Sequence, residues 1–234
     1  MKKVIYTAII GNYDDLEEPK YIPEGYDFIC FTDQKIKKSN SVWKIRQVLP
    51  LYEDNTRTAR KYKILPHRFL SEYDVSIWTD GNELIVGDVD KLQNHFLNDK
   101  NMAVYNHMSC WDKRNCVYQE AQAIFDLGNR DSNNWKDNPS IIIKQMERYN
   151  LEEYPSNNGL IVSGVMFRKH NSQDIIKAME FWWQELKRSS KRDQLSFDYS
   201  MWKTNTQFNW INQDIRNDWF VLIKLKNENS YPST

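Results

Sequence analysis

Short runs of β-branched and apolar residues alternate along the chain with stretches in which apolar positions recur every three or four residues. This alternation is typical of an α/β protein with a largely parallel sheet. The short runs predict strands at residues 3–10, 26–32, 43–48, 74–79, 102–105, 159–168 and 219–225. The helical periodicity predicts helices at residues 55–70, 89–97, 116–127, 141–149, 174–188 and 192–202, with a polar loop at 129–138. No linker divides the pattern, so we expect one domain over residues 1–234, with a mostly parallel, Rossmann-like central sheet flanked by helices.

Composition narrows the class of protein. The 234 residues carry 32 basic and 32 acidic side chains, and a zero net charge argues against a nucleic-acid-binding surface. No apolar run approaches the ~18 residues of a membrane span. The N-terminal apolar run lacks a cleavage site, so no signal peptide is expected. The odd set of Cys30, Cys110 and Cys116 has no disulfide spacing and favours a reducing compartment. We therefore expect a cytoplasmic protein, and contact with a membrane surface stays open.

Polar residues follow several of the predicted strands, where ligands bind in open α/β sheets. They are Thr7 to Tyr13, Asp33 and Asp80-Gly81-Asn82. The helix predicted at 55–70 adds cations, of which Arg57, Arg60 and Lys61 share a face and are expected to point together. Such a concentration suits a small phosphorylated ligand, although a solvated basic face explains it equally well.

Asp80-Gly81-Asn82 is the most informative local pattern. A carboxylate and an amide two residues apart supply oxygen ligands for a divalent cation, and Gly81 permits a tight bend. The same three residues are also an ordinary turn.

Seven segments, in order, resemble one known family. They are VIYTAIIGNYDDL, YDFICFTD, RTARKYKILPHRFL, YDVSIWTDGNELI, YNHMSCWDKRNCVYQEA, GLIVSGVMFRKHN and FWWQELKRSSKRDQLSFDYSMWK. Together they are similar to the plant mucilage-related and turgor-regulation glycosyltransferase-like family, which has many bacterial relatives, and a bacterial-type member is expected. The resemblance covers residues 3–203. It implies a GT-A fold and transfer of a sugar from a nucleotide-diphosphate donor, expected to be a UDP-sugar, to a saccharide or lipid-linked saccharide (glycolipid).

The resemblance also implies site residues. By position it gives a nucleotide site at Thr7, Ala8, Ile9, Tyr13 and Asp33, a diphosphate site at Arg60 and Lys63, and further donor contacts at Gly81, Ser163, Gly164 and Gln194. Asp80 and Asn82 stand where GT-A enzymes carry an Asp-x-Asp motif for Mn²⁺ or Mg²⁺. The amide at Asn82 puts tight metal binding in doubt.

The catalytic group implied by the resemblance is Asp193, acting on the acceptor hydroxyl or near the reacting carbon. The Asp193-Gln194 pair favours a retaining reaction slightly over an inverting one. His107 would position the acceptor, with nearby aromatic side chains. The alternatives are a helix N-terminal carboxylate at Asp193 and a structural histidine at His107, and Arg114 and Glu120 would equally suit a surface ion pair. A non-catalytic carbohydrate- or nucleotide-sugar-binding module is the second functional hypothesis, and a nucleotidyltransferase is the third.

Overall fold

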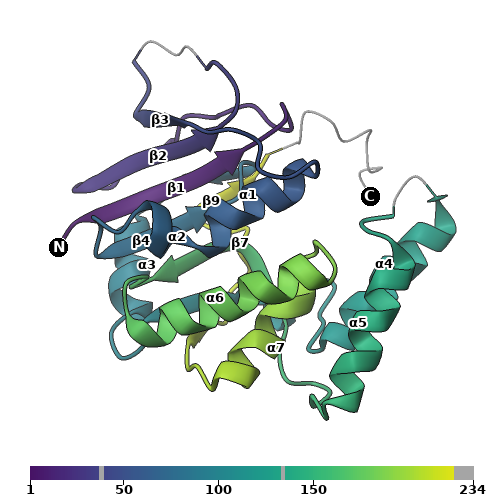
Figure 1. Ribbon diagram of the computed structural model, residues 1–234. Coiled ribbons are helices and arrows are strands. Elements are labelled where there is room, and N and C mark those ends of the chain that lie inside the picture. Colours follow the sequence, from purple (N-terminus) through teal and green to yellow (C-terminus); the bar gives the residue numbers. More distant parts are fainter. Residues whose placement is uncertain (37–39, 133–134, 224–234) are drawn as a thin grey trace.

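A computed structural model describes residues 1–36, 40–132 and 135–223. Its centre is a seven-stranded sheet in the order β3-β2-β1-β4-β7-β6-β8 (Figure 1). The strands are β1 (Lys3–Ile9), β2 (Tyr26–Thr32), β3 (Trp43–Gln47), β4 (Val75–Thr79), β6 (Met102–Asn106), β7 (Ile161–Arg168) and β8 (Asn209–Ile211). β7 runs antiparallel to both of its neighbours, and the other neighbouring pairs are parallel. The predicted mostly parallel α/β sheet is confirmed.

The described residues form seven α-helices. They are α1 (Asn55–Ile64), α2 (Pro66–Phe69), α3 (Val89–Phe96), α4 (Val117–Arg130), α5 (Pro139–Leu151), α6 (Gln173–Arg188) and α7 (Gln194–Thr204). A 3-10 turn, η1 (His107–Ser109), follows β6. The single helix predicted at 55–70 is wrong. The helix is interrupted at Leu65, because the following Pro66 disfavours helical backbone in the residue before it.

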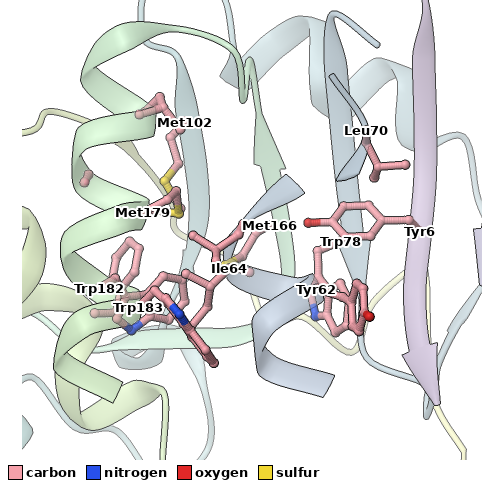
Figure 2. Packing of buried hydrophobic residues seen from close by; sticks show 14 of the residues in the cluster. Tyr6, Tyr62, Ile64, Leu70, Trp78, Met102, Met166, Met179, Trp182 and Trp183 are labelled. Carbon is pink, nitrogen blue, oxygen red and sulfur yellow. The ribbon is translucent and has the colours of Figure 1, made fainter. Parts of the chain in front are cut away.

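Successive side chains of a strand point to opposite faces of the sheet and belong to two hydrophobic clusters, one on each face. Tyr6 and Trp78 belong to the first cluster, where their rings pack edge to face with centroids 5.2 Å apart. Trp182 of α6 belongs to the same cluster, which also includes residues of α1 (Figure 2). Ile5 points to the opposite face, into the cluster that contains Leu92 of α3. Helices therefore cover both faces of the sheet.

α4 and α5 lie side by side at one end of the molecule (Figure 1). They pack against α7 through two smaller clusters that include Tyr149 and Leu195. α4 runs to Arg130, beyond the predicted end at 127, and residues 133–134 of the predicted loop lie outside the described residues.

Two short strands, β5 and β8, were not predicted from the hydrophobic pattern. β5 (Glu83–Ile85) pairs antiparallel with β9 (Phe220–Leu222) in a separate sheet, and β8 adds three residues to the edge of the main one. Residues 224 and 225 of the strand predicted at 219–225 lie outside the described residues. The three cysteines are buried and not joined by disulfides. In the part of the chain that the structure describes, no helix has both the length and the apolar character needed to cross a membrane.

Candidate functional site

The carboxyl ends of β1, β2, β4 and β6 and the amino end of β7 meet at one edge of the sheet. Because β7 is antiparallel to β4, Thr79 pairs with Val165, and the Asp80 backbone N–H donates to the Gly164 carbonyl at 2.8 Å. The turn after β4 therefore lies directly beside Ser163 and Gly164. The structure brings these predicted residues together from segments more than eighty positions apart.

Asp80 accepts three hydrogen bonds on one carboxylate oxygen. The donors to Oδ1 are Trp78 Nε1 at 2.8 Å, Lys63 Nζ at 3.1 Å and Arg60 Nη1 at 3.4 Å. Trp78 lies two residues before Asp80, so the strand itself supplies one donor, while α1 supplies both cations. Asp80 is 26% exposed, which leaves part of its carboxylate open to solvent.

Asp193 binds the same two cations from the other side. Its Oδ2 lies 2.7 Å from Lys63 Nζ and 3.3 Å from Arg60 Nε, and it accepts from Ser163 Oγ at 3.1 Å. Burial by itself raises the pKa of Asp193, but the charges of Arg60 and Lys63 outweigh it and hold the pKa well below its usual range. Burial, followed by the charge of Arg60, lowers the pKa of Lys63. Two carboxylates and two cations thus form a closely spaced, neutral cluster.

The cations of α1 do not converge as predicted. Arg60 and Lys63 face the sheet edge, but Arg57 donates to the carbonyls of Leu186 and Ser189 at the end of α6, the second at 2.8 Å. Carbonyl groups left unpaired at a helix end attract a cation. Lys61 lies over the Phe69 ring, 5.8 Å from its centroid. The shared face predicted for Arg57, Arg60 and Lys61 is therefore wrong.

The residues predicted at the end of β1 divide between the two faces of the sheet. Thr7 and Ile9 are buried on the face opposite Arg60, and Ala8 packs against the cluster that contains Tyr6. Tyr13 is 55% exposed and lies near Arg60. Strand alternation explains this division, which the resemblance did not take into account.

Asp33 joins the ends of β2 and β1. Both of its carboxylate oxygens accept from the Gly11 N–H, at 3.0 and 3.1 Å. Gly11 adopts a φ of 71°, which favours glycine. Nearby, a side chain at Gly81 would place its Cβ 3.1 Å from Asp14 Oδ2, so glycine allows the β4 turn to approach the loop after β1.

The sequence analysis missed Glu83. Its backbone N–H donates to the Asp80 carbonyl at 3.0 Å, and its Oε2 is buried without a hydrogen-bond partner among the described residues. Burial, reinforced by the negative charge of Asp80, raises the pKa of Glu83 to about 8. A small cavity beside it is lined by Thr7, Leu16, Glu17, Pro19, Trp43, Thr79, Asp80, Gly81, Glu83, Leu84 and Ile85. The only feature of the sequence that pointed to Glu83 was its position three residues after Asp80.

His107 lies in a second polar network after β6. Its Nε2 lies 3.0 Å from Arg114 Nη2, and Arg114 Nε donates to Glu120 at 2.9 Å. Burial, followed by the charge of Arg114, lowers the pKa of His107. Because Arg114 can only donate, Nε2 accepts and the ring proton belongs on Nδ1. Arg114 and Glu120 do form the ion pair that the sequence left open, but Glu120 is buried.

α7 is fastened to the start of β7 through Ile161. Gln194 Nε2 donates to the Ile161 carbonyl at 2.9 Å, and Asp198 Oδ2 accepts from the Ile161 N–H at 3.1 Å. Asp193 precedes this helix as its N-cap and accepts from the Gln194 N–H at 3.2 Å. The predicted Gln194 thus supports the strand that carries Ser163.

The residues at Asp80 and Asn82 fit a divalent cation poorly. Hard cations favour several oxygen ligands, usually with more than one carboxylate. Two positive side chains already contact Asp80 Oδ1, and the partner at position 82 is an amide. Among the described residues no group of three or more His, Cys, Asp or Glu side chains is placed to hold a metal.

The fold and this edge define an α/β protein with a charged cluster at the strand ends, where such folds bind small ligands. The chain belongs to the TOD1/MUCI70 glycosyltransferase-like domain family, whose profile matches residues 1–223. This agrees with the family resemblance of the sequence segments.

The chain is similar to a curated plant protein and to solved structures that include a yeast enzyme. "Probable hexosyltransferase MUCI70" of Arabidopsis thaliana is 25% identical over an alignment of 227 residues, which covers 88% of this chain. The chain spans 38% of that relative's length. The mannosyltransferase Ktr4p of S. cerevisiae shares 10% identity and a TM-score of 0.47, covering 93% of this chain and 69% of its own. The second likeness is too distant to carry a conclusion.

Proposed function

We propose that this chain is a GT-A glycosyltransferase that transfers a hexose from a nucleotide-diphosphate sugar, a UDP-sugar in the first instance, to a saccharide or glycolipid acceptor. The family supports sugar transfer in general. The observation that carries the proposal is the pair of cations, Arg60 and Lys63, held between Asp80 and Asp193 at the carboxyl edge of the sheet. A departing nucleoside diphosphate needs positive groups fixed at such a place.

In the proposed reaction Arg60 and Lys63 bind the diphosphate and offset the negative charge that grows as the glycosidic bond to phosphate breaks. Arg60 is 17% exposed, whereas Lys63 is fully buried. Arg60 is therefore the first contact, and Lys63 adds charge from beneath it. Tyr13 and Asp33, at the ends of the neighbouring strands, are the proposed contacts to the nucleoside.

Asp193 acts in this proposal as a positioning residue. A general base works best with a pKa near the working pH, and the paired cations hold the pKa of Asp193 far below that. Its hydrogen bond from Ser163 and its contacts with Arg60 and Lys63 suit it to keep these groups in place. A poor base at this position favours a retaining over an inverting reaction.

A Mn²⁺ or Mg²⁺ ion at Asp80 and Asn82 stays a prediction. Because the residues there fit an ion poorly, no step of the proposed reaction is assigned to it. A cytoplasmic location and a place in polysaccharide biosynthesis are likewise proposals.

The test is incubation of the protein with a panel of UDP- and GDP-sugars, alone and with oligosaccharides, followed by measurement of released nucleotide and of glycosylated product. Turnover that Arg60→Ala reduces at least tenfold supports the proposal. Lys61→Ala is the matched control, because it removes a cation from the same helix without touching Asp80 or Asp193. Binding of nucleotide sugar without turnover of any donor would instead support the non-catalytic binding module.

A further inference from the structure

Trp111 is the most exposed aromatic side chain in the described ranges. It is 79% exposed, whereas Tyr13, the next, is 55% exposed. It lies in the 107–116 loop, which connects β6 to α4 and leaves the sheet at the same edge as Asp80. Burying a ring of this size is among the larger apolar contributions to stability that one side chain makes. The ring of Trp111 stays in solvent instead.

The 107–116 loop is held in place by one guanidinium group. Arg114 contacts Asp112 Oδ2 at 2.8 Å, Glu120 Oε2 at 2.9 Å and His107 Nε2 at 3.0 Å. At the other end of η1, the Asn106 side chain caps the turn by accepting from the Met108 N–H at 3.0 Å. Trp111 therefore extends into solvent from a loop fixed on both sides.

Two sets of contacts place this loop beside the charged cluster. On one side, Glu120 lies 3.7 Å from Arg192, whose charge acts on Asp193. On the other, Asn106 donates to Asn212 at 2.9 Å. The residues just after Asn212 carry charges that act both on Cys110, next to Trp111, and on Glu83 beside Asp80. The loop thus borders the proposed reaction centre from two directions.

We propose that Trp111 is the platform on which a sugar ring of the acceptor stacks, with Asp112 beside it accepting hydrogen bonds from the sugar hydroxyls. This inference rests on the proposed function and specifies its acceptor side. A pyranose has an apolar C–H face and a rim of hydroxyl groups, which match one flat ring flanked by polar side chains.

The surroundings of Trp111 favour a saccharide over a protein partner. Protein-binding sites expose contiguous apolar patches of about several hundred Å², but Asp112 and Lys113 follow Trp111 directly, and Lys113 is exposed. A ring followed directly by charged groups gives a sugar both a stacking surface and hydrogen-bond partners.

Steady-state transfer kinetics test the platform. The acceptors are cellotetraose, xylotetraose and galactotetraose, with the donor that the wild-type protein turns over best. Trp111→Ala should raise the acceptor KM at least tenfold, while donor hydrolysis without acceptor stays within twofold. Trp111→Phe, which keeps a flat ring, should restore most of the affinity, and Tyr21→Ala is the control for losing an exposed aromatic elsewhere. An acceptor KM unchanged in Trp111→Ala would overturn the inference.

Saturation-transfer NMR with the same three oligosaccharides separates this inference from the proposed function, because it requires no turnover. The wild-type protein should transfer saturation to at least one of them, and Trp111→Ala should not. Failure of all donors in the turnover assay counts against the proposed reaction, whereas equal saturation transfer in both proteins, or none in the wild type, counts against the platform.

Discussion

Lys63 Nζ lies 2.7 Å from Asp193 Oδ2, and the two side chains are 0% and 1% exposed. Lys63 belongs to α1 and Asp193 caps α7, so the pair ties two helices together beneath the edge of the sheet. Removing one partner of a buried ion pair strands the other charge, which is costly, even where the intact pair adds little net stability.

Asp193→Asn should therefore lower the free energy of unfolding by about 3 kcal/mol. Because the pKa of Asp193 is lower in the folded state than in the unfolded state, its contribution is present above the ordinary pKa of an aspartate and is lost as the pH falls below it. Urea unfolding at pH 7 and at pH 3 measures both effects, and the variant should differ less from the wild type at pH 3. Asp218→Asn, at an exposed position, is the control. A loss under 0.5 kcal/mol at pH 7 would show that the pair is dispensable.

Lys63→Met should reduce the turnover of nucleotide sugar roughly 100-fold, the scale expected when one fixed electrostatic donor is removed from a reaction centre. Methionine keeps most of the length of the side chain and its apolar character while removing its charge. The measurement is released nucleotide at saturating donor, with urea unfolding to verify the fold. Lys61→Met, on the same helix but against Phe69, should stay within twofold of the wild type. A folded Lys63→Met protein of normal activity would exclude Lys63 from the reaction.

The long strands could be predicted because each is a run of mainly apolar and β-branched residues. β4, VSIWT, is buried at every position, and β1 is nearly so. β5 and β8 could not, because three residues are too few to show alternation, and pairing partners distant in the sequence stabilise them. The break at Pro66 was readable in principle, since a proline restricts the residue before it.

At the candidate site, the sequence pointed to Asp80 and the cations of α1 but not to how they pair. Arg60 was placed beside Arg57 and Lys61 by helix periodicity, whereas the burial of Lys63 between two carboxylates depends on where α7 begins. Glu83 was missed for the same reason. Its raised pKa of about 8 comes from burial by segments far along the chain, which no local pattern contains.

Turnover should persist in the presence of EDTA at no less than about a tenth of its value with Mn²⁺. Lys63 and Arg60 already contact Asp80, so the positive charge that a metal supplies in other sites is provided here by side chains. Nucleotide release in EDTA, Mg²⁺ and Mn²⁺ measures this directly. A fall beyond tenfold in EDTA, reversed by Mn²⁺ and lost in Asp80→Ala, would instead establish the metal site predicted from the sequence.

Asp198 should reduce stability as the pH rises, and Asp198→Asn should remove that effect. The side chain is 2% exposed, its Oδ1 has no hydrogen-bond partner among the described residues, and burial raises its pKa to about 7. A carboxyl with a raised pKa favours folding most at pH values below the ordinary pKa of an aspartate. That contribution is lost as the pH rises through about 7. The asparagine oxygen can still accept from the Ile161 N–H.

The expected result is an Asp198→Asn protein that is more stable than the wild type at pH 8, by about 1–3 kcal/mol, and of similar stability at pH 4. Urea unfolding from pH 4 to pH 8 gives both curves, and Asp218→Asn should follow the wild type throughout. Parallel curves for Asp198→Asn and the wild type would mean that Asp198 does not titrate in this range. Loss of turnover in a stabilised Asp198→Asn protein would show that the carboxyl serves the reaction at a cost in stability, in addition to holding Ile161.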